Sequence, residues 1–284
     1  MSSQIASENV ELRVDGDDVD LHYKTGGSGP PLVFLHGIGL DAATVSWRHA
    51  LPALAGERTV YAPDLPGHGE SDKPDRAYTT AYYLETVEAF LDAVDVDEPA
   101  MAGLSMGGAL ALGHALDGGS VERLVLVNSY GLGGDAVWRT AASSILQTPV
   151  LGNMMWQGVS TSKPAIRTGL RSMGAVEPSQ QLVEDVNSVV DRQTVRAMRR
   201  WQRSEFRRGG FRTNYADRLD DLSVPTLLIH GDEDPLLPPA WSRKAASALP
   251  ESELKLVENC GHNPPRECPE RFNSAVRSFC AAGE

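Results

Sequence analysis

Cysteine is scarce in this chain, and long apolar runs are missing. The 284 residues include only Cys260, Cys268 and Cys280, all near the C-terminus. An odd number of cysteines argues against a disulfide-built secreted protein, and the lack of a C-x-x-C pair argues against a thiolate metal site. No segment approaches the roughly 20 apolar residues of a membrane span, and Met1–Val10 lacks the features of a signal peptide. We therefore expect a cytoplasmic protein with no membrane partner.

Lysine is also scarce, and acidic residues predominate. The chain carries 26 basic residues, of which five are lysines, against 38 acidic ones, so its formal net charge is −12. Because phosphate binding requires lysine and arginine, this balance argues against a nucleic-acid partner. The 41% hydrophobic and 23% charged content is ordinary for a globular protein and excludes a disordered or fibrous chain.

Short apolar segments alternate with helical ones along most of the chain. The segments Val10–Val14 and Val19–Lys24 flank a turn sequence and predict an antiparallel hairpin. Continuous apolar runs follow, as expected for parallel strands buried on both faces. These runs are Pro31–Leu35, Thr59–Ala62, Pro99–Ala102, Arg123–Val127, Thr226–Ile229 and Glu253–Val257. Helical segments are Tyr82–Val94, Met106–Leu116, Ala240–Leu249 and Pro269–Cys280. The alternation predicts an α/β fold, a mostly parallel sheet with helices on both faces.

The alternation stops after Val127 and resumes at Val224. Between residues 131 and 217 the chain shows helical segments and no strand candidate. This stretch carries a charge of +5, whereas the remainder carries −17. We therefore predict a core domain formed by residues 1–130 and 218–284, with a helical cap inserted at residues 131–217.

A G-x-S-x-G sequence stands between a predicted strand and a predicted helix. It spans Gly103–Gly107, with Ser105 at its centre. A serine on so sharp a turn has a strained backbone, so the residues two positions away must lack bulky side chains. The N-terminus of the following helix also places a positive dipole end near developing negative charge. This context predicts Ser105 as a nucleophile.

A serine hydroxyl is a weak nucleophile and needs a base, usually a histidine that is held by a carboxylate. Two histidines follow Ser105. His230 lies inside a predicted strand and is expected to point into packing. His262 lies in a loop after the last predicted strand, where a base can reach a nucleophile. His262 is therefore the predicted base.

The acid should lie between the serine and the histidine, after the penultimate strand. Three carboxylates compete there. Asp232 is well placed to bond backbone groups within the turn, and Glu233 is expected to face solvent, so Asp234 is the predicted acid. Asn128, which follows the neighbouring strand, offers no carboxylate.

A second glycine-containing turn, His36–Gly39, follows the predicted strand Pro31–Leu35 and is expected to form part of an oxyanion hole. We predict that the hole combines the backbone N–H groups of Met106 and Ile38. The ring of His36 is expected to bond the loop backbone. Asp64 and His68 precede Ser105 in a turn-rich segment and are predicted to be structural.

These motifs, in this order, resemble the α/β-hydrolase fold family over nearly the whole chain. They are His36-Gly37, Asp64–Asp72, Gly103–Gly108, Gly231–Asp234 and Gly261-His262. The resemblance implies a mostly parallel eight-stranded sheet whose first connection is antiparallel, a helical cap after strand six, and no cofactor. It gives Ser105, Asp234 and His262 the triad roles. Members with an aspartate nucleophile, such as dehalogenases and epoxide hydrolases, are disfavoured by the serine.

Within the family the chain is most similar to carboxylesterases and to C–C bond hydrolases that cleave ring-fission products of aromatic degradation. The C–C hydrolases usually carry Gly-Pro-Gly after the His-Gly pair and an aromatic residue just after the catalytic histidine. Here these places hold Ile38-Gly39-Leu40 and Asn263. The departure weakens the C–C interpretation.

Arginines recur at helical spacing in the predicted cap and would share one helix face. They are Arg192, Arg196, Arg199, Arg203 and Arg207. We interpret this face as solvated or paired with the acidic body. The alternative is that one of them, or Arg200, binds a substrate carboxylate. Trp156 and Trp201 are further substrate-binding candidates, because aromatic side chains wall apolar pockets.

We expect a serine hydrolase that cleaves carboxylic esters of small molecules through an acyl-enzyme. One alternative is hydrolysis of a C–C bond in an anionic ring-fission product. Another is a ligand receptor with vestigial catalysis. The triad does not fix the leaving group, so peptidase, thioesterase and perhydrolase chemistry stay open. No metal is expected, and a homo-oligomer is compatible with the sequence.

Overall fold

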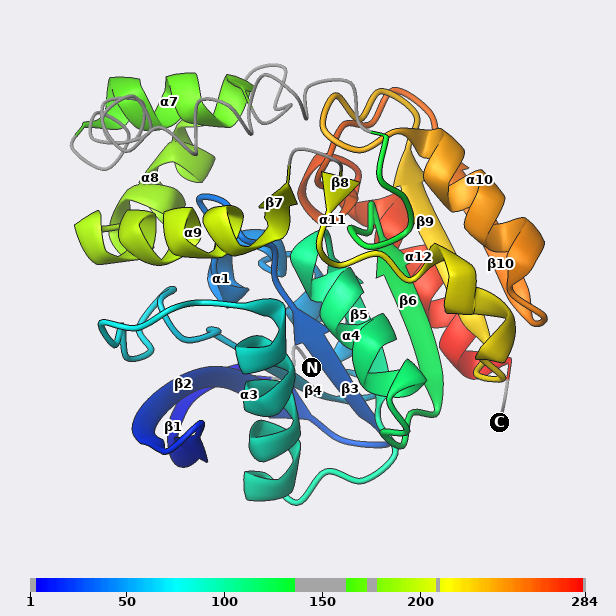
Figure 1. The fold of residues 1–284 in the computed structure, drawn as a ribbon, viewed down its shortest axis with the longest axis horizontal. Coiled ribbons are helices and arrows are strands. Elements are labelled where there is room, and N and C mark those ends of the chain that lie inside the picture. Colours follow the sequence, from blue (N-terminus) through cyan, green and yellow to red (C-terminus); the bar gives the residue numbers. More distant parts are fainter. Residues whose placement is uncertain (1–3, 136–161, 173–177, 208–209, 283–284) are drawn as a thin grey trace.

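The computed structural model describes residues 4–135, 162–172, 178–207 and 210–282. A sheet of eight strands crosses the molecule in the order β1-β2-β4-β3-β5-β6-β9-β10 (Figure 1). The strands are β1 (Ala6–Val14), β2 (Asp17–Gly27), β3 (Pro31–Leu35), β4 (Thr59–Pro63), β5 (Ala100–Leu104), β6 (Arg123–Val127), β9 (Thr226–Gly231) and β10 (Ser252–Val257). Strand β2 is antiparallel to β1 and β4, and the other neighbours are parallel. The predicted fold class is confirmed.

Helices cover both faces of the sheet (Figure 1). Residues of α3, α4 and α10 form a hydrophobic cluster on one face, and residues of α2 and α12 form a second cluster on the other. The helices of the sheet layers are α1 (Ala43–Ser46), α2 (Ala50–Leu54), α3 (Thr80–Ala93), α4 (Met106–Leu116), α10 (Pro239–Ala248), α11 (Pro264–Glu267) and α12 (Pro269–Ala281), with a 3₁₀ helix at Ala216–Asp221.

The central strands are apolar without alternation because both of their faces are buried. In β3, Leu32 and Phe34 belong to the cluster under α2 and α12, whereas Val33 and Leu35 belong to the cluster under α3 and α4. Each such side chain contributes about 1.5–3 kcal/mol through burial. This two-sided packing fixes the register of the strands, and with it the edge at which their carboxyl ends meet.

In the described part of the chain between β6 and β9, three further helices lie together in space (Figure 1). They are α7 (Lys163–Ser172), α8 (Gln180–Val189) and α9 (Arg192–Glu205). The Asp191 side chain begins α9 by accepting hydrogen bonds from the backbone N–H groups of Gln193 and Thr194. The expectation of no strand in this region was wrong: β7 (Phe206–Arg207) pairs with β8 (Gly210–Phe211). Arg207 therefore lies on a strand and not on the arginine face of α9.

These helices pack against the carboxyl edge of the sheet. Trp201 of α9 lies with its ring centroid 5.4 Å from that of Tyr130, which follows β6. A separate hydrophobic cluster joins residues of α7, α8 and α9 to Leu40, Ala42 and Val45 in the loop region after β3. The helices thus cover the edge at which the predicted site residues stand.

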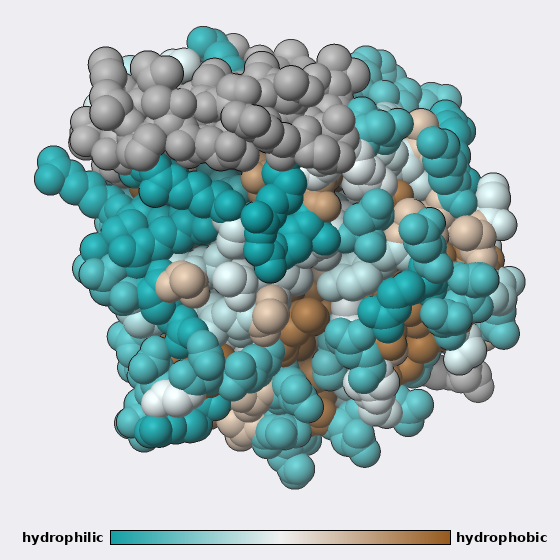
Figure 2. All heavy atoms as spheres, in the orientation of Figure 1, coloured by the Kyte–Doolittle hydropathy of each residue, from teal (hydrophilic) through white to brown (hydrophobic). Residues whose placement is uncertain are grey.

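No helix in the described ranges is long and apolar enough to cross a membrane. On the coloured part of the face in Figure 2, hydrophobic residues form small groups among hydrophilic ones. This face therefore offers no broad apolar area.

Candidate functional site

Ser105 stands on a strained turn between β5 and α4. Its backbone has φ 54° and ψ −114°, in a region that non-glycine residues rarely enter and that costs about 1–3 kcal/mol. The turn is held by hydrogen bonds from Ser105 N to the Val127 carbonyl and from Tyr130 N to the Ser105 carbonyl, both 3.0 Å long. The Ser105 hydroxyl does not cap α4, so it is not used to satisfy the helix.

Two glycines make this turn possible. A side chain at Gly103 would collide with the Gly107 backbone, and one at Gly107 would collide with the Leu35 carbonyl. The first turn of α4 therefore packs directly on β5 and β3. The N–H group of Met106 stands at the N-terminus of this helix, where backbone donors have no intrahelical partner.

Asp234, which is buried, and His262, which is partly exposed, form a hydrogen-bonded pair. The distance from His262 Nδ1 to Asp234 Oδ2 is 2.8 Å. Asp234 stands in the turn after β9, and His262 in the loop after β10, so the parallel register of the two strands brings them together. The predicted pairing of Asp234 with His262 is what the structure contains.

Charge and burial act in opposite directions on this pair. Burial raises the pKa of Asp234, but the charge of His262 and hydrogen bonds from His230, His262 and Asn128 outweigh it and hold that pKa well below its usual range. Burial lowers the pKa of His262, but the charge of Asp234 and its hydrogen bond outweigh it, so that pKa is raised. The carboxylate is therefore ionised and the imidazole is the group that titrates.

Asn128 is the site residue that sequence reasoning missed. It follows β6 at the same edge, and its Nδ2 donates to Asp234 Oδ2 at 2.6 Å and to the Gly261 carbonyl at 3.2 Å. Its Oδ1 accepts from Gly231 N at 3.2 Å. No carboxylate follows β6, but the Asn128 amide there binds the carboxylate of Asp234, which follows the neighbouring strand β9. The signal in the sequence is an asparagine directly after a strand. Asparagine tolerates the positive φ of 40° that the backbone has at this position.

Asp234, and not Asp232 as expected, bonds the backbone of the turn after β9. Asp232 and Glu233 are exposed, as expected for Glu233, but the turn is satisfied by Asp234 itself. Its Oδ1 accepts from Leu236 N at 2.8 Å and from Leu237 N at 3.2 Å. One carboxylate oxygen thus fixes the turn and the other binds His262.

His230 is buried, as predicted. Its Nδ1 lies 2.7 Å from Ser242 Oγ and its Nε2 lies 3.0 Å from the Leu237 carbonyl. The same Nε2 is 3.4 Å from Asp234 Oδ2. This histidine contacts the acid from within β9, with both of its ring nitrogens occupied by protein groups.

The predicted oxyanion loop lies against the nucleophile turn. The ring of His36 bonds the loop backbone, with Nδ1 2.7 Å from the Gly37 carbonyl and Nε2 accepting from Leu65 N at 2.9 Å. A Cβ at Gly37 would stand 3.6 Å from Ser105 Cβ. Ile38 follows directly, with its side chain between two hydrophobic clusters.

Asp64 and His68 are buried, as expected for structural residues. The Asp64 carboxylate accepts from the Ala43 and Glu70 backbone N–H groups and lies 2.8 Å from His22 Nδ1. The ring nitrogens of His68 bond no described residue. Burial lowers the pKa of His68 to about 3, so its ring is neutral.

The three predicted substrate-binding residues, Trp156, Arg200 and Trp201, have different outcomes. Trp156 lies outside the described residues. Trp201 is buried in the hydrophobic cluster beside Tyr130. The Arg200 guanidinium donates to the Arg76 carbonyl at 2.8 Å and pairs with Asp75. These contacts favour the interpretation of an arginine face that is paired with the acidic body.

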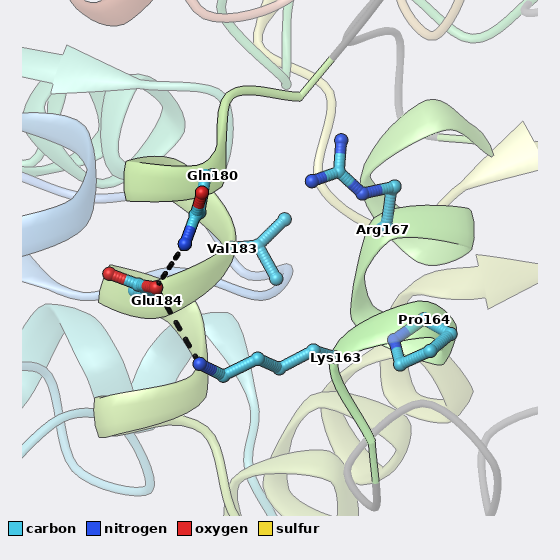
Figure 3. A pocket seen from close by; sticks show the side chains of 6 residues that line it. All are labelled: Lys163, Pro164, Arg167, Gln180, Val183 and Glu184. Carbon is cyan, nitrogen blue, oxygen red and sulfur yellow. Dashed lines mark hydrogen bonds and ion pairs between the residues drawn. The ribbon is translucent and has the colours of Figure 1, made fainter.

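A cleft of about 340 Å³ lies between α7 and α8 (Figure 3). Its lining residues are Lys163, Pro164, Arg167, Gln180, Val183 and Glu184. Glu184 accepts from Gln180 at 3.0 Å and lies 3.6 Å from Lys163 Nζ. None of the predicted catalytic residues lines it. Among the residues that the structure describes, no group of three or more His, Cys, Asp or Glu side chains is arranged to hold a metal ion.

Comparison with known proteins agrees with this geometry. The family model for the alpha/beta hydrolase fold matches residues 30–266. A 2-hydroxy-6-oxo-6-(2'-aminophenyl)hexa-2,4-dienoic acid hydrolase from Metapseudomonas resinovorans is 29% identical, over 98% of this chain and 93% of its own. An uncharacterized protein from Mycobacterium bovis is 32% identical, over 90% of this chain and 77% of its own. The chain therefore belongs to the α/β-hydrolase fold family, in the branch with a serine nucleophile.

Solved structures show the same fold. A meta-cleavage product hydrolase from Pseudomonas fluorescens superimposes with a TM-score of 0.79 at 24% identity, over 97% of this chain and 98% of that chain. An esterase from Thermogutta terrifontis superimposes with a TM-score of 0.79 at 21% identity, over the same shares of the two chains. At these identities the similarity concerns the fold alone. The two solved structures are a meta-cleavage product hydrolase and an esterase.

Replacing Asn128 tests its role at Asp234. We expect Asn128→Ala to lower the free energy of unfolding by about 1–3 kcal/mol, because it leaves the Gly261 carbonyl and Gly231 N–H buried without a partner. Urea denaturation measures this. The control Asn187→Ala, an exposed position on α8, should cost less than about 0.5 kcal/mol. Equal stability of the two variants would contradict the assignment.

Proposed function

We propose that this protein is a serine hydrolase that cleaves uncharged carboxylic esters through an acyl-enzyme. The observation that carries the proposal is the hydrogen-bonded Asp234–His262 pair, at 2.8 Å, on the same sheet edge as the strained Ser105 turn. In this proposal Ser105 is the nucleophile, His262 the general base and Asp234 the acid that orients it.

The reaction follows the triad logic. Ser105 Oγ attacks the ester carbonyl carbon while His262 Nε2 takes the hydroxyl proton, since Nδ1 is held by Asp234. The N–H groups of Met106 and Ile38 stabilise the oxyanion. The tetrahedral intermediate collapses, and the alcohol leaves with the proton from His262. Water, activated by the same base, then attacks the acyl-enzyme and releases the acid.

The cap and the setting of the protein are part of the proposal. The described part of the predicted cap, which includes α7, α8 and α9, covers this edge, and the packing of α9 on Tyr130 supports this. Trp201 contributes to its apolar wall. The substrate is a small molecule, the protein is cytoplasmic, and no nucleic acid or membrane is involved.

A second candidate is hydrolysis of a C–C bond in a ring-fission product. It is favoured by the relatives, because a 2-hydroxymuconate semialdehyde hydrolase from a Pseudomonas species is also 29% identical over 96% of this chain. Ester cleavage is favoured by the residues: Asn263 replaces the aromatic residue, and Arg200, the cation proposed for a substrate carboxylate, pairs with Asp75.

Removing the nucleophile is the direct test of the reaction. We expect Ser105→Ala to lower kcat for p-nitrophenyl butyrate by about 10³-fold or more, because the acyl-enzyme can no longer form. Ser247→Ala, an exposed serine on α10, should retain the wild-type rate. Retained activity in Ser105→Ala would overturn the assignment. Faster turnover of ring-fission products than of esters would favour the second candidate.

The raised pKa of His262 sets the pH dependence. The base must be neutral to accept a proton, so kcat/KM should fall as the pH drops through a midpoint above 6.5, the ordinary value for histidine. In Asp234→Asn the charge that raises this pKa is gone, so the midpoint should move to lower pH along with a large loss of rate. A wild-type midpoint below 6.5 would contradict this account of the pair.

A further inference from the structure

Asp41 is a buried carboxylate beside the predicted oxyanion loop, and neither the triad nor the hole uses it. The residue is 7% exposed. Its Oδ2 accepts from Gly37 N at 2.8 Å and its Oδ1 from Ala42 N at 2.9 Å. Ser46 Oγ donates to both oxygens, at 2.8 and 2.7 Å. These donors fix the position of the carboxylate.

The carboxylate stands next to the nucleophile. A Cβ built on Gly37 would lie 3.1 Å from Asp41 Oδ2 and 3.6 Å from Ser105 Cβ. Asp41 Oδ2 therefore lies no more than 6.7 Å from Ser105 Cβ. On its other side, Ser46 Oγ accepts from Asn263 Nδ2 at 3.1 Å, next to His262. Asp41 thus lies between the oxyanion loop and the loop of the base.

The charge of Asp41 is not neutralised by an ion pair with any residue in the described ranges. The charged groups that act on it are His262, whose pKa it helps to raise, and Arg266. The Arg266 guanidinium donates to the Val45 carbonyl at 2.6 Å and lies 3.4 Å from Asp185, so that carboxylate shares its charge. Glu267, which accepts from Gly261 N and Asn263 N, adds a second negative group on the loop of the base.

Two cap arginines share their charge with Asp75 and form no ion pair with Asp41. Arg196 and Arg200 both approach Asp75, and Arg200 also donates to the Arg76 carbonyl at 2.8 Å. A substrate carboxylate that entered beside Ser105 would meet the negative charge of the buried Asp41. Coulombic repulsion at such range and dielectric is large enough to change substrate preference by an order of magnitude.

We propose that Asp41 is a specificity-determining residue, whose fixed charge beside Ser105 makes the site select uncharged substrates and reject those that carry a carboxylate near the scissile bond. The inference rests on the proposed function, because it assumes that the ester bond is cleaved at Ser105. The substrates expected for this chain thus differ in charge from the dienoic acid that the name of one relative denotes.

Dimethyl succinate and monomethyl succinate provide a matched pair, followed by acid release in a pH-stat at pH 8. We expect the wild-type kcat/KM to favour the diester by about tenfold or more after correction for its two ester groups. In Asp41→Asn the preference should fall at least about threefold, because the shape is kept and the charge is lost. Ser46→Ala is the matched control: it loosens the same carboxylate without discharging it, so both substrates should slow equally and the ratio should stay.

Equal wild-type rates on the two esters would overturn the inference, and so would an unchanged ratio in Asp41→Asn. If Asp41→Asn fails to fold, the wild-type ratio still decides, together with its decrease at higher ionic strength. Failure of the proposed function gives a different result, in which neither ester is cleaved in a Ser105-dependent way.

Discussion

The carboxylate of Asp234 holds the candidate site together. One of its oxygens accepts from Leu236 N and Leu237 N, which closes the turn after β9. The other binds His262 Nδ1 and Asn128 Nδ2 and lies 3.4 Å from His230. A buried charge is tolerated only when its hydrogen-bonding capacity is filled, and here three strand ends fill it. The same contacts orient the base, so the stability of this edge and the chemistry proposed for it depend on one group.

Periodicity alone was enough to predict most of the fold. The predicted helix Met106–Leu116 and strand Arg123–Val127 coincide with α4 and β6. Short apolar runs that alternate with helical segments favour parallel strands buried on both faces. The G-x-S-x-G turn was equally readable, since Gly103 and Gly107 stand where any side chain would collide with backbone. Constraints that act within a few residues of sequence leave a local signature.

Contacts between distant elements left no such signature. Asn128 lies 106 residues before Asp234, and its role depends on β6 and β9 being neighbours. Arg200 was equally ambiguous, because periodicity places it on a helix but only the fold brings Asp75 to it. The structure shows where the +5 segment and the −17 remainder of the chain meet. The +5 segment pairs with the acidic body at Asp75, while Asp41 and Asp234, at the edge that carries the candidate site, are both buried.

The central claim is that Ser105 is made nucleophilic by a histidine that Asp234 holds in place. Active-site labelling with a fluorophosphonate, followed by peptide mass spectrometry, tests it most directly, because the probe reacts covalently with an activated serine and requires no knowledge of the substrate. The account predicts that Ser105 alone is labelled in the wild type and that the rate falls about 10³-fold or more in His262→Ala. Labelling at another serine, or an equal rate without His262, would contradict it.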